Sequence, residues 1–207
     1  MFGFQYFQRV RKFDSEKCQK FVTFELLWYN SQKGYFMERH FYFFRHGQTN
    51  ENEVGVRYGT GIDAWLTDLG VTQATKLHEF FKDKNIQIVY SSPYRRAIDT
   101  AKIAITNGTD IKIITNDALK EAIFWFWDVE DEEKKKQIND NFKLIKNYLE
   151  QIVKTDKHEN IAIASHGGVT RALCWACGHK VDGIQNAQCF HFVLDENDWK
   201  YIETFIP

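Results

Sequence analysis

The chain has 207 residues, of which 43% are hydrophobic and 16% aromatic, and its formal net charge at pH 7 is −1. This length and composition predict one folded domain with at most a short appendage, and they exclude a disordered chain. The near-neutral charge predicts no nucleic-acid partner, and charged residues interrupt every apolar run before the ~18 residues that a membrane span needs. Any anionic ligand is therefore expected to be held by a local group of cations.

The first 40 residues do not follow the pattern of the rest of the chain. In the first thirteen positions aromatic residues precede the basic ones, which is the reverse of a secretory signal. We expect residues 1–40 to be a terminal extension and residues 41–207 to be the main domain; residues 21–29 fit a strand or a helix equally well. The cysteines favour a reduced, cytoplasmic protein (Cys18, Cys174, Cys177 and Cys189). An organelle import signal in the basic N-terminus is the alternative.

From residue 41 onward, strand-like and helical patterns alternate. Strands are expected at residues 41–45, 86–90, 111–115, 161–164, 187–194 and 199–205, and helices at 67–82, after Ser91-Ser92-Pro93, at 131–154 and at 168–177. Thr67 has the side chain of a helix N-cap. Cys174 and Cys177 are expected at a helix–sheet interface, because no second cysteine pair accompanies them. The alternation predicts an α/β fold, a three-layer sandwich with a mostly parallel central sheet and helices on both faces.

Histidines follow two of the expected strands. In FYFFRHG an aromatic strand ends in Arg45 and His46, and Gly47 allows the backbone to turn sharply. In IAIASHGG a second strand ends in His166, followed by two glycines at a helix start. A single histidine before a turn is usually a structural residue, but ligand sites of open α/β sheets lie at the carboxyl ends of strands. We therefore expect the two histidines to share a site.

Arginines and an acidic residue follow two further strands. The segment SSPYRRA carries Arg95 and Arg96, and the segment LKE carries Glu121. Guanidinium groups match phosphate oxygens, and the free N–H groups at a helix start after Gly167 favour negative charge. A neutral imidazole nitrogen is a nucleophile near neutral pH. The combination predicts a pocket that performs chemistry on a phosphate group.

Five segments, in order, resemble the histidine phosphatase superfamily, the phosphoglycerate-mutase-like phosphatases. They are RHGQTNEN, LTDLGVTQA, YSSPYRRAIDTA, LKE and IASHGG, and the resemblance covers residues 41–194. It implies a phosphoglycerate-mutase-like fold and a phosphomonoesterase that works through a phosphohistidine, without a metal or cofactor. The spacing in the sequence agrees, because neither histidine has a carboxylate or cysteine nearby at metal-ligand spacing.

The resemblance also implies roles for the matched residues. His46 would accept the phosphoryl group, while Arg45, Arg96 and His166 would complete the phosphate-binding set around it. Glu121 would give a proton to the leaving group.

Further residues are expected to bind substrate. Asn52 would add a donor to the phosphate, Gly167 would offer its backbone, and Arg57 and Thr60 would border the leaving group. After Glu121 the chain departs from many relatives, because the aromatic run AIFWFWD replaces a glycine-rich segment. This departure leaves Asp128 or Glu130 as alternative proton donors.

The region between Glu121 and His166 favours hydrolysis. Only one long helix is expected there, whereas glycolytic mutases insert a larger region that encloses the substrate. We therefore expect a phosphatase for a small phosphorylated substrate or a phosphopeptide; the oligomeric state is not predicted. The alternatives are a phosphoglycerate-type mutase and an inactive phosphate-recognition module. The second alternative conflicts with the presence of Arg45, His46, Arg96 and His166 together.

Overall fold

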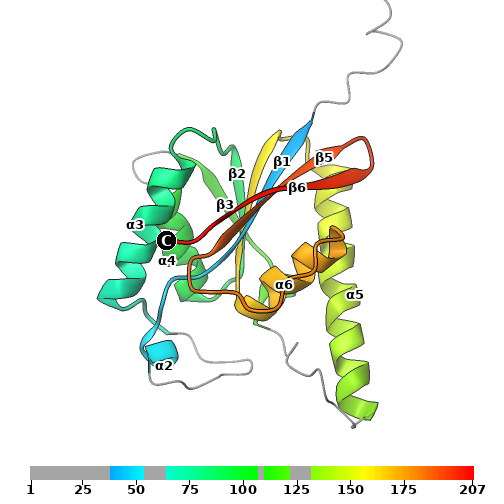
Figure 1. The fold of residues 1–207 in the computed structure, drawn as a ribbon, viewed down its shortest axis with the longest axis horizontal. Helices are drawn as coiled ribbons and strands as arrows, with labels where there is room; N and C mark the ends of the chain where they lie inside the picture. The colour runs from blue at the N-terminus through cyan, green and yellow to red at the C-terminus, as the bar shows by residue number, and fades with distance from the viewer. Residues whose placement is uncertain (1–37, 54–63, 107–109, 122–131) are drawn as a thin grey trace, which may run out of the picture. The chain divides into compact units, whose positions relative to one another are not determined.

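The computed structural model describes residues 38–53, 64–106, 110–121 and 132–207. These residues contain a six-stranded sheet of order β3-β2-β4-β1-β5-β6 (Figure 1). The strands are β1 (Arg39–Arg45), β2 (Ile88–Ser91), β3 (Lys112–Thr115), β4 (Asn160–Ser165), β5 (Cys189–Asp195) and β6 (Asp198–Phe205). The helices are α2 (Asn50–Glu53), α3 (Asp68–Phe81), α4 (Arg95–Ala104), η1 (Asp117–Leu119), α5 (Glu132–Thr155) and α6 (Gly167–Ala176).

The sheet is mostly parallel. Strands β3, β2, β4 and β1 run parallel to their neighbours, whereas β5 is antiparallel to β1 and β6 is antiparallel to β5. Helices α3 and α4 lie on one face of the sheet, and α5 and α6 lie on the other (Figure 1). This is the expected three-layer α/β sandwich. The expectations for residues 1–37 lie outside the described residues.

The aromatic strand β1 is buried on both faces. Phe41 and Phe43 belong to the core beneath α5 and α6, while Tyr42 and Phe44 belong to the core beneath α3 and α4. This alternation follows from the two-residue period of a strand. Each of the four side chains is at most 2% exposed, and burying one contributes about 1.5–3 kcal/mol of transfer free energy. Strand β1 is thus a firmly packed support for the residues that follow it.

Helix α3 packs against the turn that follows β1. Thr67 is its N-cap, as expected, and the Thr67 hydroxyl accepts a hydrogen bond from the Gly70 N–H. The Gln48 N–H donates to the Gln73 side chain at 2.8 Å, and the Thr67 N–H donates to the Gln48 carbonyl at 3.0 Å. A Cβ added to Gly70 would lie only 2.1 Å from the Gln48 oxygen, so only glycine permits this approach.

Helix α4 begins later than the serine pair suggests. Its N-cap residue is Tyr94, which makes no side-chain capping bond. The Ser92 hydroxyl accepts from the Tyr94 N–H at 3.3 Å, ahead of the first helical residue, and it also bonds the His166 ring at 2.8 Å. At the other helix and strand ends, the observed boundary lies no more than two residues from the expected one.

The buried cysteines are packing residues, as expected. Cys174 and Cys177 are free thiols in the core between α6 and the sheet. Burial raises the pKa of the Cys174 thiol, which keeps it protonated and unreactive. In the described part of the chain, every helix is too short or too polar to cross a bilayer.

Candidate active site

The strands β1 and β4 bring the two histidines together. They pair in parallel, with Arg45 opposite Ser165, so His46 and His166 leave the sheet at the same level. Their ring centroids lie 5.2 Å apart, and the residues are 2% and 0% exposed. Two segments separated by more than a hundred residues therefore form one polar site at the carboxyl edge of the sheet, as expected.

The hydrogen bonds of His46 define its tautomer. Nδ1 lies 2.7 Å from the Gly47 carbonyl oxygen, which can only accept, so Nδ1 carries the ring proton. Nε2 consequently holds a lone pair, and the Arg96 Nε–H points at it from 3.3 Å. The turn after β1 is also held by α4, because the Gly47 N–H donates to the Thr100 hydroxyl at 3.0 Å. His46 thus presents an unprotonated nitrogen to the site.

The surroundings keep both histidines neutral. Burial lowers the pKa of His46 well below its usual value, and the charges of Arg45 and Arg96 lower it further. Burial likewise lowers the pKa of His166, with the neighbouring His46 and the same two arginines adding to the effect. At pH 7 both rings are uncharged, which leaves the two guanidinium groups as the cations of the site.

The two guanidinium groups reach the site from different elements. Arg96, on the first turn of α4, is 7% exposed and faces His46. Arg45, at the end of β1, donates from Nη1 to the Ile184 carbonyl at 2.8 Å. Its buried Nε has no hydrogen-bond partner among the described residues. A Cβ added to Gly167 would lie 3.6 Å from this Nε, so the Arg45 side chain lies along the start of α6.

Arg95 points away from the histidines. It is exposed, pairs with Asp99 at 3.3 Å and places its guanidinium 3.2 Å from the centroid of the Trp65 ring. Arg96 and Arg95 therefore face different surroundings, as their 100° separation on a helix requires.

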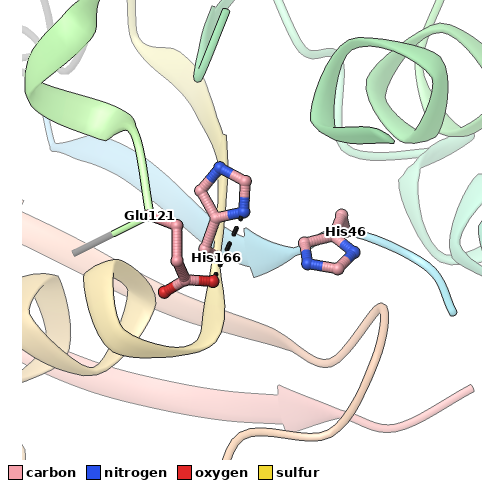
Figure 2. A group of neighbouring side chains, drawn as sticks. All are labelled: His46, Glu121 and His166. Carbon is pink, nitrogen blue, oxygen red and sulfur yellow. Dashed lines mark ion pairs between the residues drawn. The ribbon is translucent and has the colours of Figure 1, made fainter. Parts of the chain in front are cut away.

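Glu121 lies beside His166. The chain reaches it directly after η1, and its Oε2 is 3.6 Å from His166 Nδ1 (Figure 2). On the other side of the ring, His166 Nε2 bonds the buried Ser92 hydroxyl at 2.8 Å. The ring of Tyr94 meets the ring of His166 edge-on at 5.5 Å. His166 is thus held by the Ser92 hydroxyl at Nε2, while its buried Nδ1 faces the Glu121 carboxylate without a hydrogen bond.

Three of these side chains have the composition of a metal site. One ligand atom from each of His46, Glu121 and His166 lies within 4.8 Å of the others. A carboxylate that is distant from both histidines in the sequence is therefore close to them in the folded protein. A divalent cation would, however, sit beside Arg45 and Arg96, and Arg96 already donates to the nitrogen of His46 that would bind it. The charges of the cluster suit an anion better than a cation.

Asn52 is linked to the His46 backbone. Its Oδ1 accepts from the Thr49 N–H at 3.2 Å and from Asn186 Nδ2 at 3.0 Å. The same Asn186 amide donates to the His46 carbonyl at 3.2 Å.

The structure gathers most of the candidate residues, which are Arg45, His46, Asn52, Arg96, Glu121, His166 and Gly167. The remaining candidates, Arg57 and Thr60, lie outside the described residues, as do the alternative acids Asp128 and Glu130. Four further residues near the site carry no role predicted from the sequence: Ser92, Tyr94, Thr100 and Asn186. Ser92 and Tyr94 follow the end of a strand, and this position in the sequence could have indicated that they lie near the site. Asn186 lies in a loop and has no such indication in the sequence.

A profile described as "Histidine phosphatase superfamily (branch 1)" matches residues 41–148. The chain belongs to the histidine phosphatase superfamily. The "Putative phosphoserine phosphatase 2" of Hydrogenobacter thermophilus is 30% identical to this histidine phosphatase over 169 residues, which cover 70% of this chain and 82% of that protein. The "Metal-independent phosphoserine phosphatase" of Arabidopsis thaliana is 29% identical over 157 residues, which cover 62% and 64% respectively.

The fold of this histidine phosphatase is phosphoglycerate-mutase-like. A phosphoglycerate mutase structure from Bacillus anthracis superposes with a TM-score of 0.66 at 21% sequence identity, over 81% of this chain and 92% of that one. Family membership identifies the chain as a phosphoric monoester hydrolase, and the phosphohistidine route is general to the family. The expectations of fold, family and phosphatase activity are therefore confirmed.

Proposed function

We propose that this histidine phosphatase hydrolyses a small phosphomonoester and that His46 Nε2 attacks the phosphorus. The orientation of the His46 ring carries the proposal, because the Gly47 carbonyl holds the proton on Nδ1 and leaves the Nε2 lone pair directed toward Arg96. A phosphate group bound by Arg96 would meet this lone pair. Arg45 and His166, with Asn52 and the Gly167 N–H, would hold the other phosphate oxygens.

In the first step a bond forms between His46 Nε2 and phosphorus, and the bond from phosphorus to the leaving oxygen breaks. Glu121 in its protonated form gives a proton to that oxygen, and the positive charge on the phosphorylated ring is stabilised by the Nδ1–H bond to Gly47. In the second step water attacks the phosphohistidine, Nε2 leaves, and the Glu121 carboxylate accepts a proton from the water. Glu121 lies within reach of the site through its position beside His166.

O-phosphoserine is the first substrate to test. The two relatives above carry the name phosphoserine phosphatase. We propose the same class of substrate here, a small phosphorylated metabolite. The mutase alternative makes a different prediction, which is sustained isomerisation of a phosphoglycerate without release of inorganic phosphate.

The nucleophile is tested by trapping. Incubation with radiolabelled O-phosphoserine, followed by an alkaline quench and peptide mapping, should place acid-labile phosphate on His46. His46→Ala should abolish turnover and leave the melting temperature within a few degrees of the parent. His158→Ala is the control, because His158 is half-exposed near the start of β4, at the opposite edge of the sheet. Undiminished turnover by His46→Ala would contradict the assignment.

We also propose that the catalytic domain corresponds to residues 41–207 and that the enzyme is cytoplasmic. The compactness of residues Glu38–Pro207 supports the first proposal, and the free thiols of Cys174, Cys177 and Cys189 support the second. A chain beginning at Glu38 should retain the specific activity of the full chain, and fractionation of the native cell should recover the protein with cytoplasmic markers.

A further inference from the structure

We propose that Asn186 is a positioning residue that orients the amide of Asn52 toward the phosphate. Asn186 lies in the loop between α6 and β5, remote in sequence from every motif of the site. The inference rests on the proposed role of Asn52 as a phosphate donor. It assigns a function to a contact that links α2, the end of β1 and this loop.

The orientation of the Asn52 amide follows from its partners. The Thr49 N–H, 3.2 Å away, can only donate, so the Asn52 atom that faces it must be the oxygen. Asn186 Nδ2 donates to the same oxygen at 3.0 Å. With Oδ1 held by two donors, the Asn52 NH₂ group is fixed on the opposite side of the amide and is kept for another acceptor.

The orientation of the Asn186 amide is fixed in the same way. Its nitrogen meets two oxygens, Asn52 Oδ1 and the His46 carbonyl at 3.2 Å, and neither of these can donate. The His46 carbonyl also accepts from the Ala187 N–H at 3.0 Å. One amide group thus sets the position of Asn52 relative to the residue that carries the proposed nucleophile.

The loop that carries Asn186 is itself held in place by hydrogen bonds from two arginine side chains, Arg45 and Arg171. The Ile184 carbonyl accepts from Arg45 Nη1 at 2.8 Å, and the Asp182 carbonyl accepts from Arg171 Nη1 at 3.1 Å. Arg171 is only 3% exposed, so this second anchor is shielded from water. Donors on a supported loop are more accurately positioned than donors on a free one, which favours binding of a fixed phosphate geometry.

The test is a double-mutant cycle on Asn52 and Asn186, read out as the vanadate inhibition constant together with kcat and KM. Asn52→Ala should weaken vanadate binding about tenfold or more, the fold-change of a hydrogen bond to a charged group. Asn186→Ala should weaken it about three- to tenfold, because Asn52 keeps the Thr49 bond and part of its orientation. The double variant should match Asn52→Ala to within about twofold. Gln185→Ala, an exposed neighbour in the same loop, is the matched control and should equal the parent.

The outcomes separate the inference from the function on which it rests. If Asn52→Ala binds vanadate like the parent, the proposed role of Asn52 is wrong and the inference is overturned with it. If Asn52→Ala is impaired and Asn186→Ala is not, the role of Asn52 stands and the inference alone is overturned. If the two losses multiply in the double variant, Asn186 acts by another route and the inference is also overturned. Melting temperatures of all four variants establish that the comparison is made on folded protein.

Discussion

At the scale of single residues, the two adjacent arginines of α4 have different surroundings and should have different functions. Arg96 is buried and faces His46, whereas Arg95 is exposed, pairs with Asp99 and stacks on Trp65. A guanidinium inside a desolvated cationic pocket binds an anion far more strongly than one in water. Of these two adjacent arginines, only Arg96 should therefore contribute to the chemistry of the site.

We predict that Arg96→Ala weakens vanadate inhibition by more than tenfold. The lost interaction is a charge-assisted hydrogen bond, worth about 1.5–3 kcal/mol. Arg95→Ala should change the inhibition constant by less than about twofold, because the Arg95 guanidinium is exposed and contacts Asp99 and Trp65 rather than His46. Inhibition constants of both variants, measured beside the parent at one ionic strength, check the prediction. A larger loss for Arg95 would show that the first turn of α4 is rotated relative to the described structure.

The protonation of His46 and His166 is a second prediction at this scale. Because burial and the two arginines lower both pKa values, the rings should remain neutral as the pH falls through 6.5, where an ordinary histidine gains half a proton. Titration of the ring C–H resonances by NMR, without phosphate in the buffer, measures this directly. Arg96→Gln should move both pKa values upward but leave them below 6.5, since burial persists. Midpoints at or above 6.5 in the parent would contradict the neutral-imidazole mechanism.

At the scale of elements, the contact between α3 and the turn after β1 supports the position of His46. Gly47 and Gly70 approach each other closely, since a Cβ on Gly47 would lie 2.5 Å from the Gly70 oxygen and one on Gly70 would lie 2.1 Å from the Gln48 oxygen. Both obstacles are backbone atoms, which cannot rotate away as a side chain can. The turn and the helix must therefore keep glycine at both positions.

We predict that Gly70→Ala destabilises the fold although it lies inside a helix. Alanine in place of glycine gains about 0.5–1 kcal/mol of helix propensity, but the steric conflict with the Gln48 backbone costs about 1–3 kcal/mol or more, so the net effect is destabilising. Urea denaturation gives the change in free energy of unfolding, and kcat should fall with it because the turn moves His46. Gly183→Ala is the control, because nothing lies within 4 Å of its Cβ position. Equal stability of the two variants would contradict this account.

Local patterns predicted the elements well where the signal lies in the residues themselves. The run FYFF predicts a strand buried on both faces because every side chain is apolar and bulky, and the Thr67 hydroxyl predicts a cap because its partner is three residues away. The start of α4 was predicted too early, since the helix begins at Arg95, and the bond of the Ser92 hydroxyl to His166, 74 residues later, has no local signal either. Asn52 and Asn186 are 134 residues apart in the sequence, and no local pattern marks their contact. Composition and motif spacing therefore do not predict it.

At the scale of the whole molecule, buried neutral histidines make stability depend on pH. His46, His166 and His191 are at most 6% exposed, and burial, with the neighbouring His40 adding to it, lowers the pKa of His191 to about 4. Below pH 6.5 the unfolded chain gains protons at these residues while the native protein does not. The free energy of unfolding must therefore fall as the pH is lowered from 6.5.

We predict a loss of up to about 1.4 kcal/mol per pH unit for each such histidine between pH 6.5 and pH 5. Urea denaturation in phosphate-free buffers across this range measures the slope. His191→Phe should reduce the slope by up to one histidine's share and keep the stacking on Tyr42, whose ring lies 4.3 Å from that of His191. A stability that is constant from pH 6.5 to pH 5 would show that the buried rings take up protons in the native state as well.

The strand order also has a consequence during synthesis. Strand β1 leaves the ribosome well before both of its partners, because β4 and β5 begin only at Asn160 and Cys189. Until those segments emerge, the aromatic run Phe41–Phe44 has no backbone partner in the sheet, and a nascent chain exposes it to every other growing chain nearby. Unpaired apolar strands of this kind bind holding chaperones and aggregate without them. The strand that places His46 in the finished enzyme is therefore open to misassociation while the enzyme is being made.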